Sequence, residues 1–313
     1  MRVKRAVLLA ALAAAIPAFL TVGVVPAHAT FPGTNGRIAF STDFASPSQI
    51  YTMRPDGSGF LQLTHVRTSP GASTPSWSPD GTRISFAKDK HIWVMSSDGS
   101  GKTQLSNEDG FRDRQPSWSP DGLKIVFSRC DVSLGFNAYC DIDVMDADGT
   151  NVVTLLGGNW IQDHPRYSPD GSKIAFSGNR GGYVCAVWVM DADGSNPIRL
   201  TDPAMQANSP DWSPDGTKIV MSSHCKLPGS KVWIMDADGS DPQQLTPQEG
   251  DWVNPRFSPD GLTIAVGGPT IEGSKVCCWD LYFMNLDGSN VEPIANPRPG
   301  IVSFEWGPKP VAP

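Results

Sequence analysis

Beyond its first 29 residues, the chain has no apolar run long enough to span a membrane and no helical hydrophobic periodicity. It also has no excess of positive charge, no Gly-x-Ser-x-Gly motif and no Cys-x-x-Cys pair. Without helical periodicity, the hydrophobic pattern predicts an all-β protein. The missing motifs exclude the nucleophile elbow of the α/β-hydrolases and argue against a thiolate metal site.

The N-terminus is built differently from the rest of the chain. A basic start is followed by apolar residues 6–25 and by the small-x-small sequence Ala27-His28-Ala29. This pattern predicts a signal peptide of residues 1–29, export to the periplasm, cell envelope or medium, and a mature single-domain propeller of residues 30–313. An uncleaved membrane anchor is the alternative, which the cleavage sequence disfavours. Losing three positive charges takes the formal net charge from −7 to −10, so we expect no nucleic-acid partner.

One sequence unit is repeated along the mature chain. Its first half is an aromatic residue followed by Ser-Pro-Asp-Gly and an Ile-x-Phe-like strand. The aromatics are Trp77, Trp118, Tyr167, Trp212 and Phe257, with a degenerate copy at Trp306, and their spacings are 41, 49, 45, 45 and 49. Pro and Gly supply the backbone angles of a tight turn between two strands. Repeats of this length are typical of propeller blades.

The second half of the unit supplies two further strands. A hydrophobic strand ends in Met, a turn closes on Asp-Gly, and a short strand ends in a Leu-Thr type. Four strands per unit and six units predict a six-bladed β-propeller with four-stranded blades. The chain begins with a second strand at 36–40 and ends with a lone aromatic strand at 304–306, so we expect the last strand to complete the first blade and close the ring.

These motifs resemble a known family. Trp-Ser-Pro-Asp-Gly with Ile-x-Phe, then Met-Asp-x-Asp-Gly-Ser-Asn and Leu-Thr, is similar to the PD40 (WD40-like) repeats of TolB-like six-bladed propellers, over about residues 35–308. The resemblance implies the fold and leaves the function open, because one fold carries many functions. The six repeats occupy nearly all of the mature chain, so we expect neither the extra domain of TolB nor the hydrolase domain of the dipeptidyl-peptidase relatives.

One face of such a ring is a better candidate for binding than the other. The short, uniform turns fall on one side, called here the bottom face, and the variable loops fall on the other, the top face. Function generally lies on variable loops held by a rigid scaffold. The ligand-binding residues predicted around the top-face mouth are Arg112, Arg114, Gln115, Trp160, Asp163, His164, Asn208, Asp251, Trp252 and Asn254. Solvated loop tips, with both tryptophans packed down, are the alternative.

A second candidate set lies closer to the ring axis, at the position before each aromatic. Four consecutive repeats place alternating charges there: Arg166, Asp211, Arg256 and Glu305. One interpretation is inter-blade ion pairing, Arg166 with Asp211 and Arg256 with Glu305, because buried charges need partners. The other is a channel lining that recognises a charged peptide terminus or side chain.

Six cysteines in an exported chain predict disulfides. Cys130 and Cys140 bracket one loop, and a disulfide between them would staple it. Cys185 and Cys225 lie on top loops of adjacent blades, and a disulfide between them would tie these blades together. Cys277 and Cys278 then remain as a neighbouring pair, or one of them pairs elsewhere. Metal-binding thiolates are the alternative.

Three classes of function remain. We expect a binding scaffold that holds a peptide or protein partner at the top face, with no metal, no cofactor and no catalytic residues, because no catalytic constellation is visible. The alternative enzyme resembles the oligogalacturonide-lyase propellers, which share these repeats and hold a metal with clustered histidines. It requires His164 to converge on a metal with Asp163, Gln115 or Asp251. A third possibility is carbohydrate binding at Trp160 and Trp252.

Overall fold

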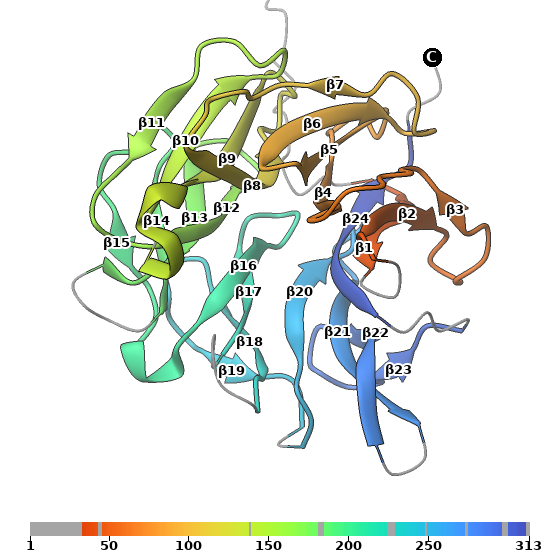
Figure 1. Ribbon diagram of the computed structural model, residues 1–313. Coiled ribbons are helices and arrows are strands. Elements are labelled where there is room, and N and C mark those ends of the chain that lie inside the picture. The colour runs from red at the N-terminus through yellow and green to blue at the C-terminus, as the bar shows by residue number, and fades with distance from the viewer. Residues whose placement is uncertain are drawn as a thin grey trace, which may run out of the picture.

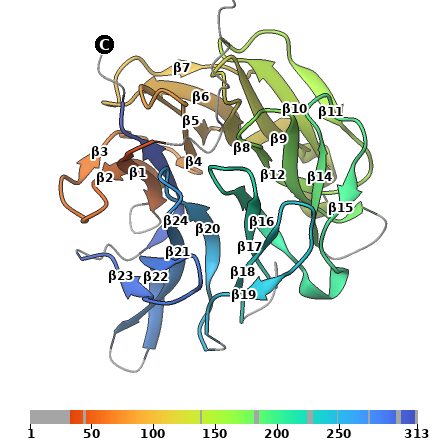
Figure 2. The ribbon, with the colours of Figure 1, turned by 180° about the vertical axis from the view of Figure 1, so that it is seen from behind.

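The computed structural model describes residues 33–42, 46–137, 139–180, 185–223, 229–247, 249–272, 275–295 and 300–310. These residues form six four-stranded antiparallel sheets. Figure 1 looks onto the ring, with the first strand of each blade next to the centre and the fourth at the periphery, and Figure 2 shows the same order from behind. The prediction of an all-β, six-bladed propeller is confirmed. The predicted signal peptide, residues 1–29, lies outside the described residues.

Each blade runs outwards from the axis through four strands. The inner strands of blades 1 to 6 are β24 (Ile301–Pro308), β4 (Ala72–Trp77), β8 (Phe111–Trp118), β12 (Gln162–Tyr167), β16 (Asn208–Trp212) and β20 (Val253–Phe257). The second strands are β1 (Asn35–Thr42), β5 (Arg83–Lys88), β9 (Lys124–Asp131), β13 (Lys173–Gly178), β17 (Lys218–Ser222) and β21 (Thr263–Glu272).

The outer half of each blade is shorter at its edge. The third strands are β2 (Gln49–Met53), β6 (His91–Ser96), β10 (Cys140–Asp146), β14 (Ala186–Asp191), β18 (Val232–Asp236) and β22 (Lys275–Asn285). The edge strands are β3 (Leu61–Gln62), β7 (Thr103–Gln104), β11 (Val153–Leu156), β15 (Ile198–Arg199), β19 (Gln243–Gln244) and β23 (Glu292–Pro293). Among the described residues, two short 3-10 helices, η1 (Val132–Asn137) and η3 (Pro203–Met205), lie in connections.

The Ser-Pro-Asp-Gly turns hold themselves together through their own side chains. In blade 2, the Ser78 hydroxyl donates to Asp80 Oδ1 at 2.6 Å, and the Arg83 N–H donates to Ser78 Oγ at 2.9 Å. Gly81 takes φ 68°, which a residue with a Cβ adopts only at a cost. The outer turns use an aspartate similarly, as where Ser100 N–H donates to Asp98 Oδ1 at 2.8 Å. The repeated aspartates therefore serve hairpin formation.

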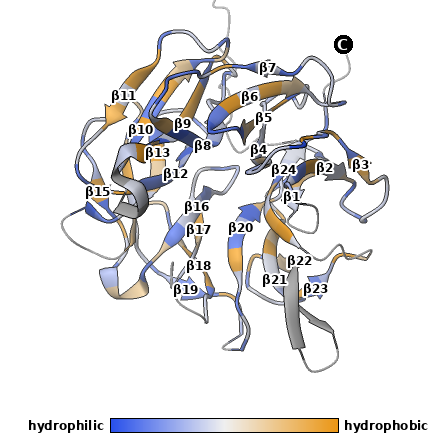
Figure 3. Ribbon diagram, viewed as in Figure 1, coloured by the Kyte–Doolittle hydropathy of each residue, from blue (hydrophilic) through white to orange (hydrophobic). Residues whose placement is uncertain are grey.

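Hydrophobic side chains fill the spaces between neighbouring blades. Each second strand contributes an apolar pair such as Ile84 and Phe86, and both are fully buried. The inner-strand aromatics pack beside them, with Trp118 only 1 % exposed. Figure 3 shows hydrophobic colour along the blades and hydrophilic stretches on the inner strands β8, β12 and β20. Because each blade buries both faces against its neighbours, no blade has a complete core of its own.

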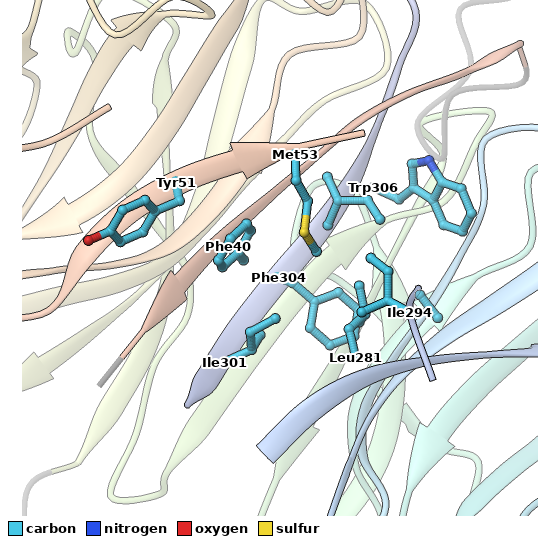
Figure 4. Close-up of a cluster of buried hydrophobic side chains, with 10 residues drawn as sticks. Phe40, Tyr51, Met53, Leu281, Ile294, Ile301, Phe304 and Trp306 are labelled. Carbon is cyan, nitrogen blue, oxygen red and sulfur yellow. The ribbon is translucent and has the colours of Figure 1, made fainter. Parts of the chain in front are cut away.

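The ring is closed by the pairing of β24 with β1. Ile38 lies opposite Trp306 and Phe40 opposite Phe304 in an antiparallel register. Ile301, Phe304 and Trp306 then pack with Met53 of blade 1 and with Leu281 and Ile294 of blade 6 (Figure 4). The last strand therefore completes blade 1 and joins it to blade 6, as the repeat order predicts.

The connections hold two findings on the sequence predictions. The predicted Cys130–Cys140 disulfide is confirmed, and it joins two residues that face each other across β9 and β10. Cys185 is also disulfide-bonded, while its predicted partner Cys225 and the side chains of Cys277 and Cys278 lie outside the described residues. Residues 268–272 and 275–277 belong to β21 and β22, which pair as far as Glu272 and Lys275 with a register shift between Thr270 and Ile271.

Ring closure has a sensitive point at Gly307. A Cβ at this position would lie 2.5 Å from Cγ of Trp77, so Gly307→Ala forces the closing strand and blade 2 apart. We expect a loss of about 1–3 kcal/mol in the free energy of unfolding, measured by urea denaturation. Gly157→Ala is the control, because its Cβ comes no closer than 3.5 Å to Asp141.

Deletion of residues 301–313 should open the ring, and a truncated protein that melts like the full chain would contradict this closure.

Candidate functional site

Five inner strands contain the same bulge, one residue before the proline that precedes each blade's axial position. The bulge residues, called here the bulge ring, are Thr74, Gln115, His164, Ser209 and Asn254, with φ between 49° and 54°. Strand pairing shifts register at each of them. The following proline has no N–H to lose from the ladder, which is why a bulge is tolerated here. Because this strained backbone conformation recurs at the same position in five blades, it is a regular structural feature of the axis.

The bulge ring is bound together from blade to blade. Thr74 N–H donates to Ser303 Oγ at 3.1 Å, Gln115 N–H to Thr74 Oγ1 at 3.3 Å, and His164 N–H to Gln115 Oε1 at 3.1 Å. On the other side of the axis, Ser209 Oγ donates to Asn254 Oδ1 at 3.1 Å. The amides freed by the bulges are thereby satisfied by the neighbouring blade, and a polar collar forms around the axis.

A cavity of about 510 Å³ opens at this collar on the top face. Its walls combine Thr74, Gln115, His164 and Asn254 with apolar surface from prolines, Val302 and Phe304. This volume lies in the usual range for ligand pockets, about 300–1,000 Å³. Because this cavity is centred on the polar collar at the ring axis, we take it as the candidate site.

Half of the predicted ligand-binding set lines this cavity. Arg112, Arg114, Gln115, His164 and Asn254 are wall residues. Asp163 stands behind the wall, where its Oδ2 accepts from Arg114 at 2.8 Å. Asp163 therefore fixes the direction of Arg114.

The remaining predicted residues have contacts outside the cavity. Trp252 is only 8 % exposed and meets the Tyr282 ring edge-on at 5.1 Å. Asp251 accepts from the Ser230 N–H at 2.9 Å and secures a top loop of blade 5. Trp160 and Asn208 are half-buried and do not line the cavity. Trp252 is thus a packed lid, which is the alternative weighed for it above.

Sequence reasoning missed the blade 2 side of the cavity. The connection between β5 and β6 is a tight turn at Asp89 and Lys90, with φ 51° and 73°. Such a turn barely rises above the sheet, so the cavity extends over it and is lined by Lys88, Asp89 and Lys90. The predicted site residues lie on the inner strands and longer loops, whereas this two-residue connection shapes the opening. The absence of any spacer between two strand patterns at residues 83–96 was the available signal.

The predicted channel charges form the floor. Arg166 and Glu305 make an ion pair, and Glu305 Oε1 also accepts from Ser76 Oγ at 3.0 Å and from Trp77 N–H at 3.2 Å. Inner strands contact each other in blade order, so blades 4 and 1 face each other and this pair crosses the axis. The direct ion pair therefore spans the ring, whereas the sequence analysis had placed the pairs between neighbouring blades. Breaking such a buried pair from one side costs about 3–5 kcal/mol.

The other two channel charges are held less directly. Asp211 Oδ2 accepts from the Phe257 N–H at 2.9 Å, and burial raises the pKa of Asp211 to about 6 despite the nearby Arg256 and Arg166. Arg256 donates to the Pro255 carbonyl at 2.7 Å, and its Nε has no hydrogen-bond partner. Burial, with repulsion from Arg166, lowers the pKa of Arg256 to about 10. All four charges line a second, very small cavity of about 20 Å³ below the floor.

His164 is held as a neutral acceptor. Gln115 Oε1 accepts a hydrogen bond from the backbone N–H of His164. The side-chain amide nitrogen of Gln115 therefore faces the ring nitrogen Nε2 of His164 at 2.7 Å and must donate to it. Nδ1 then carries the proton, and it is buried without a partner. Burial lowers the pKa of His164 to about 4, with Arg256, Arg114 and Arg166 adding to the effect of burial. A proton on Nε2 would oppose the Gln115 donor directly.

The comparisons with known proteins agree with this architecture. Residues 132–267 match the family model of the PD40 TolB β-propeller domain. A TolB homologue of Chlorobium luteolum is 32 % identical over 145 residues, which cover 46 % of this chain and 32 % of that protein. The chain therefore matches about a third of the length of this curated relative.

Two solved structures show the same fold. TolB from Acinetobacter baumannii superposes with a TM-score of 0.70 at 24 % identity, over 88 % of this chain and 67 % of that one. An oligogalacturonate lyase in complex with manganese superposes with a TM-score of 0.60 at 19 % identity, over 85 % of this chain and 75 % of that one. Fold and repeats together define a six-bladed β-propeller with a polar, charged axis. The chain has the fold of the TolB propeller, and residues 132–267 match the PD40 repeat family of such propellers.

The state of His164 gives a pH prediction. Its folded pKa lies below the ordinary value of 6.5, so the unfolded chain binds the proton first, and stability present above pH 6.5 is lost as pH falls towards 4. Between pH 7 and 5 we expect wild type to lose at most about 2 kcal/mol relative to His164→Gln. Urea denaturation of both proteins isolates this contribution, because Asp211, with its raised pKa, acts in the opposite direction in both. An NMR titration midpoint of His164 near 6.5 would show that the ring is not held in this way.

Proposed function

We propose that this chain is an exported binding module whose top face and channel mouth hold a peptide segment of a protein partner. The observation that supports it most is the top-face cavity of about 510 Å³, with polar groups at the collar and apolar patches beside them. A peptide offers both backbone amides and side chains to such a wall.

Export fits the covalent chemistry of the chain. The Cys130–Cys140 disulfide needs an oxidising compartment, and residues 1–29 have the sequence pattern of a signal peptide. The mature protein is then residues 30–313, a single propeller. None of the described residues belongs to a helix long and apolar enough to cross a membrane.

The family likeness favours a protein partner over a small substrate. A TolB homologue is among the curated relatives of this chain, although the match covers only part of its length. The rigid collar also suits binding without chemistry, because its side chains are already engaged with one another, as Gln115 is with His164 and Asn254 with Ser209.

A metal-assisted enzyme acting on polysaccharide is the second candidate, favoured by the fold it shares with the manganese-bound lyase. Each of its proposed ligands already has a partner for one of its atoms. His164 Nε2 accepts from Gln115, Asp163 accepts from Arg114, and Asp251 secures a loop of blade 5. Carbohydrate stacking on Trp252 is disfavoured because that ring is buried. The side-chain contacts therefore favour the binding module.

The proposal is tested by site-specific photo-crosslinking during export. A photoreactive residue replaces Arg112, exposed on the top face, or Leu123, which is 66 % exposed in a bottom-face turn. We expect the Arg112 position to crosslink a defined protein that the Leu123 position does not. The purified partner should then bind wild type more tightly than Asn254→Ala, and bind Leu123→Ala as well as wild type. Equal crosslinking from both faces, or none from the top face, would count against a top-face partner.

A further inference from the structure

The cavity at the channel mouth has a charge opposite to that of the protein. The chain carries a formal net charge of −7. Yet six cationic side chains line the cavity, against only two acidic ones, Asp89 and Asp113. The six are Lys88, Lys90, Arg112, Arg114, Arg166 and Arg256. A concave, low-dielectric site of one sign concentrates ligands of the other sign.

Three of these cations are compensated within the protein. Lys88 pairs with Asp89 at 2.5 Å, Arg114 with Asp163 at 2.8 Å, and Arg166 with Glu305 across the axis. The acid Asp113 is likewise used, because Arg129 binds it at 2.8 Å from outside the cavity. Both acids of the wall are therefore neutralised by cations of the protein and are not available to the remaining cations.

The other three cations have no ion pair with any described residue. Lys90 and Arg112 are exposed at the rim. Arg256 is only 6 % exposed and lies deeper, where it lines both the cavity and the small space below it. Its one hydrogen-bond acceptor is the Pro255 carbonyl, and its Nε has no partner. Asp211 and Glu305 are near enough to interact with it electrostatically but form no direct ion pair, so this guanidinium lacks the bonded carboxylate that a buried one ordinarily has.

The rim cations are positioned by backbone geometry. Lys90 occupies a left-handed turn position, and its carbonyl accepts from the Asp113 N–H at 2.8 Å, which ties the turn to β8. Arg112 lies next to that contact on the same strand. Lys90 and Arg112 thus lie at the entrance without ion pairs, and Arg256 lies at the floor. The apolar side chains of Val302 and Phe304 line the same wall.

On the basis of the proposed function, we propose that the cavity binds a carboxylate of an extended peptide, with Arg256 as its anchor and Lys90 and Arg112 as the cations that guide it in. A guanidinium matches a carboxylate with two parallel N–H···O bonds, which an uncharged group cannot accept as well. The apolar wall accommodates neighbouring residues of the peptide. The carboxylate is either a C-terminus or an acidic side chain, since both present the same group.

The test uses three N-acetylated hexapeptides in NMR titrations of the full mature protein. Ala-Gly-Ser-Ala-Gln-Ala with a free C-terminus carries only the terminal carboxylate. Ala-Gly-Ser-Ala-Glu-Ala amide carries only the side-chain carboxylate, and Ala-Gly-Ser-Ala-Gln-Ala amide carries none. We expect at least one charged peptide to bind about tenfold or more tightly than the uncharged one, and which peptide binds identifies the source of the carboxylate. Binding should weaken as salt rises.

Variants locate the carboxylate. Arg256→Met keeps the aliphatic part of the side chain without the guanidinium and should remove most of the tenfold preference. Lys309→Met should not change it, because this exposed cation follows the end of β24 that lies beside the Gly81 turn of the bottom face. Should Arg256→Met fail to fold, the double variant Lys90→Met/Arg112→Met alters exposed rim positions only, and a severalfold weaker affinity is expected.

Three outcomes would overturn the inference: equal affinity for charged and uncharged peptides, an unchanged preference in both cation variants, or binding of a uronate trisaccharide with none of the peptides. Top-face crosslinking is measured separately. A partner crosslinked at Arg112 whose affinity is unaffected by Arg256→Met would retain the binding module and reject the carboxylate anchor. If no partner crosslinks at the top face but the peptides show the expected selectivity, the carboxylate anchor would be retained and the protein partner rejected.

Discussion

The pairing of β24 with β1 is the interaction on which the rest of the structure depends. Every blade buries its faces against two neighbours, so no blade is complete until the ring is closed. Closure also brings Glu305 to the axis, where it meets Arg166 from the opposite blade. The same strand provides Ser303 to the polar collar and Val302 and Phe304 to the cavity wall. Fold stability and site geometry therefore share one strand.

Repeated strain at the axis gives the site its character. In five of the six blades, the left-handed residue before proline places one polar side chain at the collar, and the neighbouring blade satisfies the amide it frees. A rigid polar collar results without long loops. Ligand-binding sites are usually preformed in this way, since ordering side chains on binding costs affinity.

The fold was readable from the sequence because each turn motif and aromatic marks a strand by local chemistry. Trp77, Trp118 and Trp212 repeat the same position, so blade number and closure follow from spacing. The site was only partly readable. Arg166 pairs with Glu305 because its long side chain reaches across the axis to the opposite blade, which strand order does not predict. Trp252 packs inwards because its ring meets the Tyr282 ring edge-on. The two-residue turn at Asp89 and Lys90 shaped the cavity from a place that loop length made inconspicuous.

The central claim is that the mouth of the ring, rather than its uniform turn face, is where this propeller binds. Hydrogen exchange measured by mass spectrometry, with and without the purified partner identified by crosslinking at Arg112, tests it most directly. The account predicts added protection in segments 70–75, 88–90 and 111–116, which line the cavity, and none in the bottom turns at 78–82 and 119–123. Protection confined to the bottom turns would contradict it.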